Sequence, residues 1–194
     1  MANKKTRAID KTDFEKIIHT IKTGFTTSKG ERVRPNLRIA TALTLQANLG
    51  LRIGDIVRLR LADIIFESGR YRLDIIEEKT GKARTFTVPT DIYIFLQNYA
   101  LENNIKPKSR LFNLTVRAIQ RHVQKVCDYL GLEDVSTHSF RKYFANSIYV
   151  ENDFNVELVR ELLQHSSVAV TQHYLSIDSK TVETALQKHI VIPV

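Results

Sequence analysis

The sequence predicts a mainly α-helical domain with a small three-stranded antiparallel sheet, an α+β fold. Three observations predict it. Through most of the chain, apolar residues recur at three- and four-residue steps, as amphipathic helices require. Over residues 64–88 this pattern gives way to short β-branched and aromatic runs separated by turn residues. The 194 residues are 43% hydrophobic and 26% charged, which suits one folded domain with its own core.

The first two helices are predicted on either side of a polar loop. Thr12 is the expected N-cap of the first helix, and residues 23–35 are the expected loop. Residues 36–49 are apolar on more than one side, which indicates a helix buried on most faces, ending at Gly50 in a left-handed cap. A further helix is expected to begin at residue 51. Arg52 therefore lies in a tight turn between two buried helices.

The sheet is predicted from three short runs, residues 64–66, 71–76 and 85–88. The turn at residues 79–82 carries lysines, which on local grounds are solvent-exposed side chains. Thr90 is the expected N-cap of the next helix.

The helix predicted after residue 115 has two distinct faces. Apolar residues line one side, while Arg117, Arg121 and Lys125 follow one another at four-residue steps on another. Such a stripe is more often a solvated face than a contact surface. In a chain of net charge +8 it is also a reasonable DNA-facing element.

The net charge of +8 favours a polyanionic partner, to which binding would weaken steeply as salt rises. Composition alone does not separate nucleic acid from an anionic membrane surface. The sequence has no run of eighteen apolar residues and no secretory signal at its start. Its single cysteine, Cys127, excludes an internal disulfide, lies at a core position and suits a reducing cytoplasm.

Residues 137–175 hold an unusual density of groups able to bind an anion and attack it. His138, Arg141, His165 and Tyr174 all fall at or near the ends of predicted helices. Ser167 is the expected N-cap of the short helix that presents Tyr174.

Several motifs together resemble the catalytic domain of the tyrosine recombinases, the phage integrase family. In chain order they are Leu49-Gly50-Leu51-Arg52-Ile53-Gly54-Asp55, Lys79-Thr80-Gly81-Lys82, His138-Ser139-Phe140-Arg141, Leu162-Leu163-Gln164-His165-Ser166-Ser167 and Tyr174. Each motif alone is weak, but their order and spacing are specific. The resemblance covers nearly everything from Arg7 onward.

The resemblance implies site-specific DNA recombination without metal or other cofactor. Tyr174 would attack the scissile phosphate, leaving a 3′-phosphotyrosyl link and a free 5′-hydroxyl. A phenol suits this role because it leaves far more readily than a sugar alkoxide, so the intermediate is reversible. The partner would be double-stranded DNA carrying a specific recombination site.

The resemblance also assigns the other roles. Arg52 and Arg141 would hold the phosphate oxygens, for which a permanently charged guanidinium fork is well suited. His165 would add a third donor, and His138 would assist proton transfer at the tyrosine. Lys79 would be the general acid for the departing 5′-oxygen, and Lys82 is the alternative candidate for this role. Lys82 is also expected to contact DNA, as are the residues of the basic stripe.

Three positions depart from the family pattern. Asp55 stands where glutamate is usual, Lys142 replaces a common second histidine, and Gln164 replaces the usual glycine before His165. None of these changes removes a group that does chemistry.

The chain is expected to form a single catalytic domain over residues 1–194, without the N-terminal core-binding domain that most relatives carry. It would then be either a fragment or one of the small recombinases, such as fimbrial invertases, that consist of this domain alone. The segment after Tyr174, ending in apolar residues 190–194, would either dock on its own domain or pack on a neighbouring protomer within a tetramer.

Two alternative functions remain open from the sequence. One is relaxation of supercoils, as in type IB topoisomerases, which use a related set of residues. The other is a non-catalytic DNA-binding regulator on the same scaffold, against which the intact set of six candidate residues argues.

Overall fold

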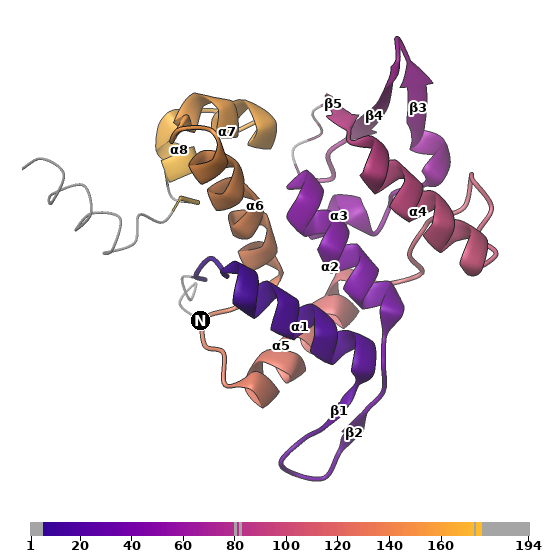
Figure 1. The fold of residues 1–194 in the computed structure, drawn as a ribbon, viewed down its shortest axis with the longest axis vertical. Coiled ribbons are helices and arrows are strands. Elements are labelled where there is room, and N and C mark those ends of the chain that lie inside the picture. Colours follow the sequence, from indigo (N-terminus) through magenta and orange to yellow (C-terminus); the bar gives the residue numbers. More distant parts are fainter. Residues whose placement is uncertain (1–5, 80, 82, 173, 176–194) are drawn as a thin grey trace, which may run out of the picture.

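The computed structural model describes residues 6–79, 81, 83–172 and 174–175. The described elements follow in the order α1 (Lys11–Thr23), β1 (Phe25–Thr26), β2 (Arg32–Val33), α2 (Leu37–Leu49), α3 (Ile53–Ile56), η1 (Leu61–Asp63), β3 (Ile64–Glu67), β4 (Arg70–Ile76), β5 (Ala83–Val88), α4 (Thr90–Glu102), α5 (Val116–Leu130), α6 (Thr137–Glu151), α7 (Val156–Leu163) and α8 (Val168–Gln172). The predicted class, mainly helical with a small antiparallel sheet, is confirmed (Figure 1).

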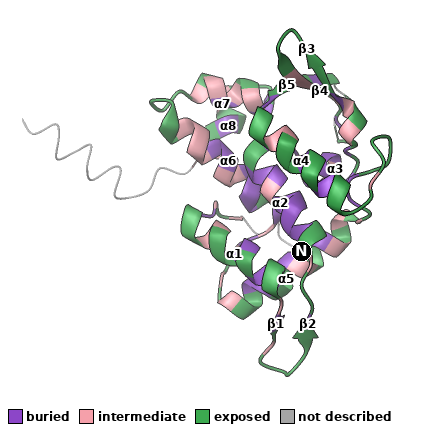
Figure 2. Cartoon of the chain, turned by 45° about the vertical axis from the view of Figure 1, so that its right-hand side comes forward, coloured by how far each residue is buried: buried purple, intermediate pink, exposed green. Residues whose placement is uncertain are grey.

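Helix α2 is the central element of the fold. It packs against α1 and α6 and is buried along most of its length, as its apolar sequence predicts (Figure 2). Asn36 caps its N-terminus by accepting from the backbone N–H of Ile39 at 3.1 Å. Gly50 ends it in the left-handed conformation, with φ of 60°. The turn that carries Arg52 therefore begins on a rigid, buried helix end.

Strands β3, β4 and β5 form an antiparallel meander in that order. Leu73 at the centre of β4 pairs with Ile64 on one side and Phe86 on the other. Figures 1 and 2 place this sheet at one end of the molecule and the β1–β2 hairpin at the other. The residues that follow β4, Glu77 and Glu78, pair with Arg52 and Arg58 on either side of α3.

A second, smaller apolar cluster joins α6 to α7. Its buried members are Phe144, Ala145, Val159 and Leu163, and Tyr174 packs against it. The larger cluster extends from Ile9 to Phe140 and includes Cys127, whose thiol is buried as expected. Burial raises the pKa of that thiol to about 11, so it stays protonated.

Some local predictions were wrong. Asp10, not Thr12, caps α1, because its carboxylate accepts from the N–H of Asp13 at 2.7 Å. Thr90 is the first residue of α4 rather than its cap, since the helix begins directly after Pro89.

Two further elements also differ from expectation. The loop predicted over residues 23–35 contains the β1–β2 hairpin, in which Phe25 pairs with Val33. The helix expected from residue 51 is only the single turn α3, and the chain continues into η1. In the described part of the chain, no helix is long and apolar enough to cross a membrane.

Candidate active site

Arg141 lies at the centre of the site, on the second turn of α6. Ser136 caps this helix by accepting from the N–H of His138 at 3.2 Å. Only 1% of Arg141 is exposed. Its Nη1 donates to the carbonyl of Gly50, and its Nη2 donates to the carbonyl of Leu163 at 3.0 Å. Arg141 therefore connects the turn before Arg52 to the end of α7.

The close approach of α2 to α6 at this point requires a glycine. Gly50 has a positive φ, and a Cβ added there would overlap the ring of Phe144. The glycine of the Leu49–Asp55 motif thus has a packing role as well as a capping role.

His165 follows α7 and reaches Arg141. Gln164, which precedes it, adopts the left-handed conformation with φ of 51°, which explains why glycine is usual at this position in the family. The Nδ1 atom of His165 lies 3.1 Å from Thr171 Oγ1, and its Nε2 lies 3.5 Å from Arg141 Nη2. Because a guanidinium only donates, the Nε2 atom facing it is the unprotonated one, and Nδ1 carries the proton.

The imidazole of His165 is neutral at physiological pH. Burial, and after it the nearby charge of Arg141, lowers its pKa to about 4. The expected donation to a phosphate through Nε2 therefore requires this ring to take up a proton. An arriving phosphate favours that uptake, because a nearby anion stabilises the imidazolium.

Tyr174 lies just beyond α8, which Ser167 caps by accepting from the N–H of Val170 at 3.3 Å, as predicted. The centroid of its ring is 4.7 Å from that of His165, and Cζ of Arg141 is 5.9 Å from the ring centroid. The ammonium of Lys142 is 6.0 Å from the same centroid. The tyrosine ring therefore packs beside the two groups predicted to hold a phosphate.

Arg52 approaches this cluster as the N-cap residue of α3. It forms an ion pair with Glu77. Burial lowers the pKa of Arg141 to about 10, and the charges of Arg84 and Arg52 contribute to this shift. Nearby, Asp55 accepts from the backbone N–H of Glu78 at 2.9 Å. Burial raises the pKa of Asp55 above its ordinary value, while that hydrogen bond opposes the rise.

His138 occupies the first turn of α6, with its side chain exposed. Partial desolvation lowers its pKa, and the charges of Arg141, Lys79, Lys142 and Arg52 lower it further. A neutral imidazole in this position is able to accept a proton.

Lys79 is exposed and lies close enough for its charge to act on His138. The two residues before it are held by arginines that flank α3, since Glu77 pairs with Arg52 and Glu78 pairs with Arg58 at 2.5 Å. Lys82 lies outside the described residues. The structure therefore brings Lys79 to the same region as the other five candidate residues.

The basic stripe on α5 is exposed, as expected for Arg117, Arg121 and Lys125. Lys125 is paired with Glu31 at 2.6 Å. Figures 1 and 2 place α5 towards the β1–β2 end of the molecule, away from the β3–β5 sheet. The stripe is thus separate from the cluster around Tyr174.

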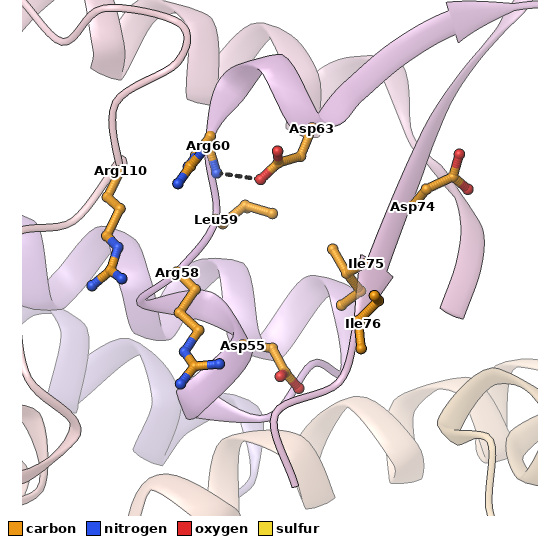
Figure 3. Close-up of a pocket in the computed structure, with 9 residues that line it drawn as sticks. All are labelled: Asp55, Arg58, Leu59, Arg60, Asp63, Asp74, Ile75, Ile76 and Arg110. Atoms are coloured by element: carbon orange, nitrogen blue, oxygen red, sulfur yellow. Dashed lines mark hydrogen bonds between the residues drawn. The ribbon is translucent and has the colours of Figure 1, made fainter. Parts of the chain in front are cut away.

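A pocket of about 360 Å³ is lined in part by Asp55 (Figure 3). Three arginines and three aspartates surround it, with apolar residues beside them: Arg58, Arg60, Arg110, Asp55, Asp63, Asp74, Leu59, Ile75 and Ile76. The N–H of Arg60 donates to Asp63 at 2.9 Å, which is the hydrogen bond drawn in Figure 3. None of the six candidate residues lines this pocket, so it is distinct from the site around Tyr174.

Sequence reasoning missed two charged residues of the site, Glu77 and Arg84. Both are buried, and Arg84 lies 3.5 Å from Glu77 through its Nη1. A signal was available for Arg84, because strand alternation places it on the same face of β5 as Phe86 and Val88. A charged residue on the inward face of a strand indicates a buried ion pair.

This helical domain with its short antiparallel meander has the catalytic-domain fold of the tyrosine recombinases. XerH recombinase bound to a palindromic difH substrate, in a post-cleavage complex, matches with a TM-score of 0.73 at 22% identity, covering 96% of this chain and 54% of that one. The catalytic domain of bacteriophage HP1 integrase matches with a TM-score of 0.59 at 19% identity, covering 95% of both chains.

The chain belongs to the phage integrase family, whose model matches residues 7–181. It is 30% identical over 146 residues to the "probable integrase/recombinase YoeC" of Bacillus subtilis, which covers 71% of this chain and 77% of that protein. It is 27% identical over 167 residues to tyrosine recombinase XerA of Pyrococcus furiosus, which covers 80% of this chain and 56% of XerA. The chain thus spans just over half the length of that curated relative.

Proposed function

We propose that this protein is a site-specific DNA recombinase that cleaves and rejoins DNA through a 3′-phosphotyrosyl intermediate. The observation that carries the proposal is the packing of Tyr174 against both Arg141 and His165. A nucleophile and two phosphate-binding groups are thereby held together by three successive helices, α6, α7 and α8. Family membership supports the same reaction.

In the proposed cleavage step, the phenolic oxygen of Tyr174 forms a bond to the scissile phosphorus, and the bond from phosphorus to the 5′-oxygen breaks. His138 takes the phenolic proton, since its lowered pKa keeps the ring in the neutral form that has an unprotonated nitrogen. Lys79 gives a proton to the departing 5′-oxygen. Arg52, Arg141 and a protonated His165 stabilise the charge on the remaining phosphate oxygens. The rejoining step is the exact reverse, with a 5′-hydroxyl as the nucleophile.

The proposed partner is double-stranded DNA. The net charge of +8 supports binding to its phosphates. Arg117, Arg121 and Lys125 are proposed contacts to the DNA backbone. For Lys125 this requires competition with Glu31, because the two are paired in the DNA-free protein. Lys82 is proposed as a further contact.

We also propose that residues 1–194 act as one catalytic domain and that the enzyme works in the cytoplasm. The segment after Leu175 is proposed to mediate self-association into a tetramer on DNA. That segment lies outside the described residues.

Covalent capture tests the proposed chemistry. The protein is incubated with a pool of duplexes whose central base pairs are randomised and which carry a nick beside the scissile position. The short 5′-hydroxyl fragment then diffuses away after cleavage and leaves the adduct trapped. Sequencing of the DNA in the adduct yields a substrate, called the captured duplex below.

Wild-type protein is expected to form an adduct that resists denaturation, and Tyr174→Phe is expected to form none. An adduct with Tyr174→Phe would contradict the assignment of the nucleophile. Tight binding without any adduct would favour a DNA-binding regulator. Relaxation of supercoiled plasmid without exchange between two captured sites would favour topoisomerase-like activity.

A further inference from the structure

Glu77 lies between two arginines, inside the protein, two residues before Lys79. Only 3% of its side chain is exposed. One carboxylate oxygen pairs with Nη1 of Arg52, and the other lies 3.5 Å from Nη1 of Arg84. The carbonyl of Glu77 also accepts from the N–H of Gly81 at 2.9 Å, which closes the turn that carries Lys79. One residue therefore contacts both Arg52 and the base of the lysine turn.

Arg84 supports Glu77 from the opposite side. Only 2% of its side chain is exposed, and its Nη2 donates to the carbonyl of Leu162 near the end of α7. The next carbonyl along, that of Leu163, accepts from Arg141. Two buried arginines thus hold the carbonyl end of the helix that leads to His165, where cations are favourable.

Three guanidinium groups, those of Arg52, Arg84 and Arg141, are consequently gathered before any DNA phosphate is bound. Besides burial, the charges of Arg84 and Arg52 lower the pKa of Arg141, and the charge of Glu77 opposes this shift. Bringing like charges together in a poorly solvated site is costly unless a counter-charge is present. Glu77 provides that counter-charge.

The contact also fixes how Arg52 is oriented. Its Nη1 atom is buried against Glu77, while 22% of the side chain stays exposed. A guanidinium has two edges, so an arginine held by a carboxylate on one edge is able to present the other to a phosphate. The exposed part of Arg52 is thus available to a phosphate, and its charge already acts on both Arg141 and His165.

We propose that Glu77 is a positioning residue for the cleavage step. It holds Arg52 so that the exposed edge of the guanidinium can bind the scissile phosphate, while Arg84 contacts the other carboxylate oxygen of Glu77. This inference rests on the proposed strand-cleaving function. A buried ion pair contributes little net stability compared with apolar packing of the same volume, which makes a purely structural purpose a poor reason for burying these charges.

The test compares Glu77→Gln with wild type on the captured duplex. Glutamine keeps the shape of the side chain but removes its charge. Single-turnover cleavage is expected to slow about 10²-fold, as small displacements of phosphate-binding groups do. DNA affinity, measured by fluorescence anisotropy with Tyr174→Phe added to prevent cleavage, is expected to stay the same or to tighten, because a negative charge beside the phosphate site is lost. A purely structural role would instead weaken DNA binding together with cleavage.

Glu67→Gln is the matched control, since Glu67 makes an exposed ion pair with Arg72 on the β3–β4 hairpin. Its cleavage rate is expected to equal that of wild type. Arg84→Met is the second variant, in which an apolar side chain of similar length replaces the brace. It is expected to slow cleavage with DNA affinity retained, and it keeps the proposal testable if Glu77→Gln does not fold.

The outcomes separate this inference from the function on which it rests. If wild-type protein forms no adduct with any duplex, the proposed function fails. If wild type forms the adduct and Glu77→Gln cleaves within about threefold of its rate, only the role of Glu77 is wrong. Equal losses of cleavage and DNA affinity in both variants would likewise overturn it.

Discussion

Arg141 and Gly50, 91 positions apart in the sequence, are joined by a hydrogen bond from the guanidinium to the glycine carbonyl. The same glycine ends α2 and allows the Phe144 ring to pack against it. The position of Arg141 and the turn before Arg52 are therefore set by one contact between two buried helices. A substitution at Gly50 should therefore displace both Arg52 and Arg141.

Gly50→Ala should lower the free energy of unfolding by about 2–5 kcal/mol. The left-handed conformation costs a Cβ-bearing residue about 1–2 kcal/mol, and overpacking against Phe144 adds about 1–3 kcal/mol. Urea denaturation measures the change. Gly131→Ala is the matched control, because Gly131 has a φ of 67° but open space around its Cβ position. Equal losses in the two variants would show that the Phe144 contact is unimportant.

Arg141→Lys should impair stability and cleavage together. A lysine keeps the charge but has a single nitrogen, so it is unable to donate to Gly50 and Leu163 in the geometry of a guanidinium. Leaving one buried carbonyl unsatisfied costs about 1–3 kcal/mol. Urea denaturation and capture of the adduct check the two effects. Retention of full stability would mean that these carbonyls find other partners.

Gln164→Gly should raise the free energy of unfolding by about 1 kcal/mol, because Gln164 has a positive φ that glycine adopts without strain. Gln164→Ala is the control and should change stability little, since alanine also carries a Cβ. Thermal denaturation of the three proteins provides the comparison. A similar gain for alanine and glycine would exclude backbone strain as the cause.

The pH dependence of stability should report the buried imidazole of His165. Its pKa falls from an ordinary value of about 6.5 in the unfolded chain to about 4 in the folded protein. The unfolded state therefore binds more protons between these values, and stability falls as the pH is lowered from about 6.5 to about 4. The loss due to this group is about 3 kcal/mol, and it is absent above about pH 6.5.

His165→Asn should remove that part of the pH dependence. Urea denaturation from pH 7 to pH 4 should show a steeper loss for wild type than for the variant. The difference between the two proteins isolates His165, because the other titrating groups are common to both. Parallel pH profiles would mean that His165 has the same pKa in the folded and the unfolded protein.

The order of elements was predictable because helical and strand periodicities are local properties of the sequence. The cap at Gly50 was predictable for the same reason, since glycine alone adopts its conformation freely. The N-cap of α1 was assigned to Thr12 instead of Asp10 because both residue types cap helices. The local sequence does not decide which of the two precedes the first turn. The β1–β2 strands are two residues each, which is too short for a period to be visible.

The candidate site was predictable only in part. Residues with recognisable motifs, such as Arg52 and Tyr174, were identified from spacing and resemblance. Glu77 and Arg84 were missed because their significance arises from burial and mutual contact, which depend on how β4 and β5 dock against α3 and α7. A charge is ordinary in a sequence and becomes informative only once its environment is known.

Lys79→Ala should slow cleavage of the captured duplex by about 10²–10⁴-fold, the usual effect of losing a general acid. The defect should disappear when the 5′-bridging oxygen is replaced by sulfur. A thiolate leaves without a proton, because a thiol has a pKa of about 8.5 and a sugar hydroxyl is a far weaker acid. Lys82→Ala should show a smaller defect that sulfur does not correct, as expected for a DNA contact. If sulfur restored cleavage in Lys82→Ala alone, Lys82 would be the general acid and Lys79 the DNA contact. If sulfur restored cleavage in neither variant, another residue would be the general acid.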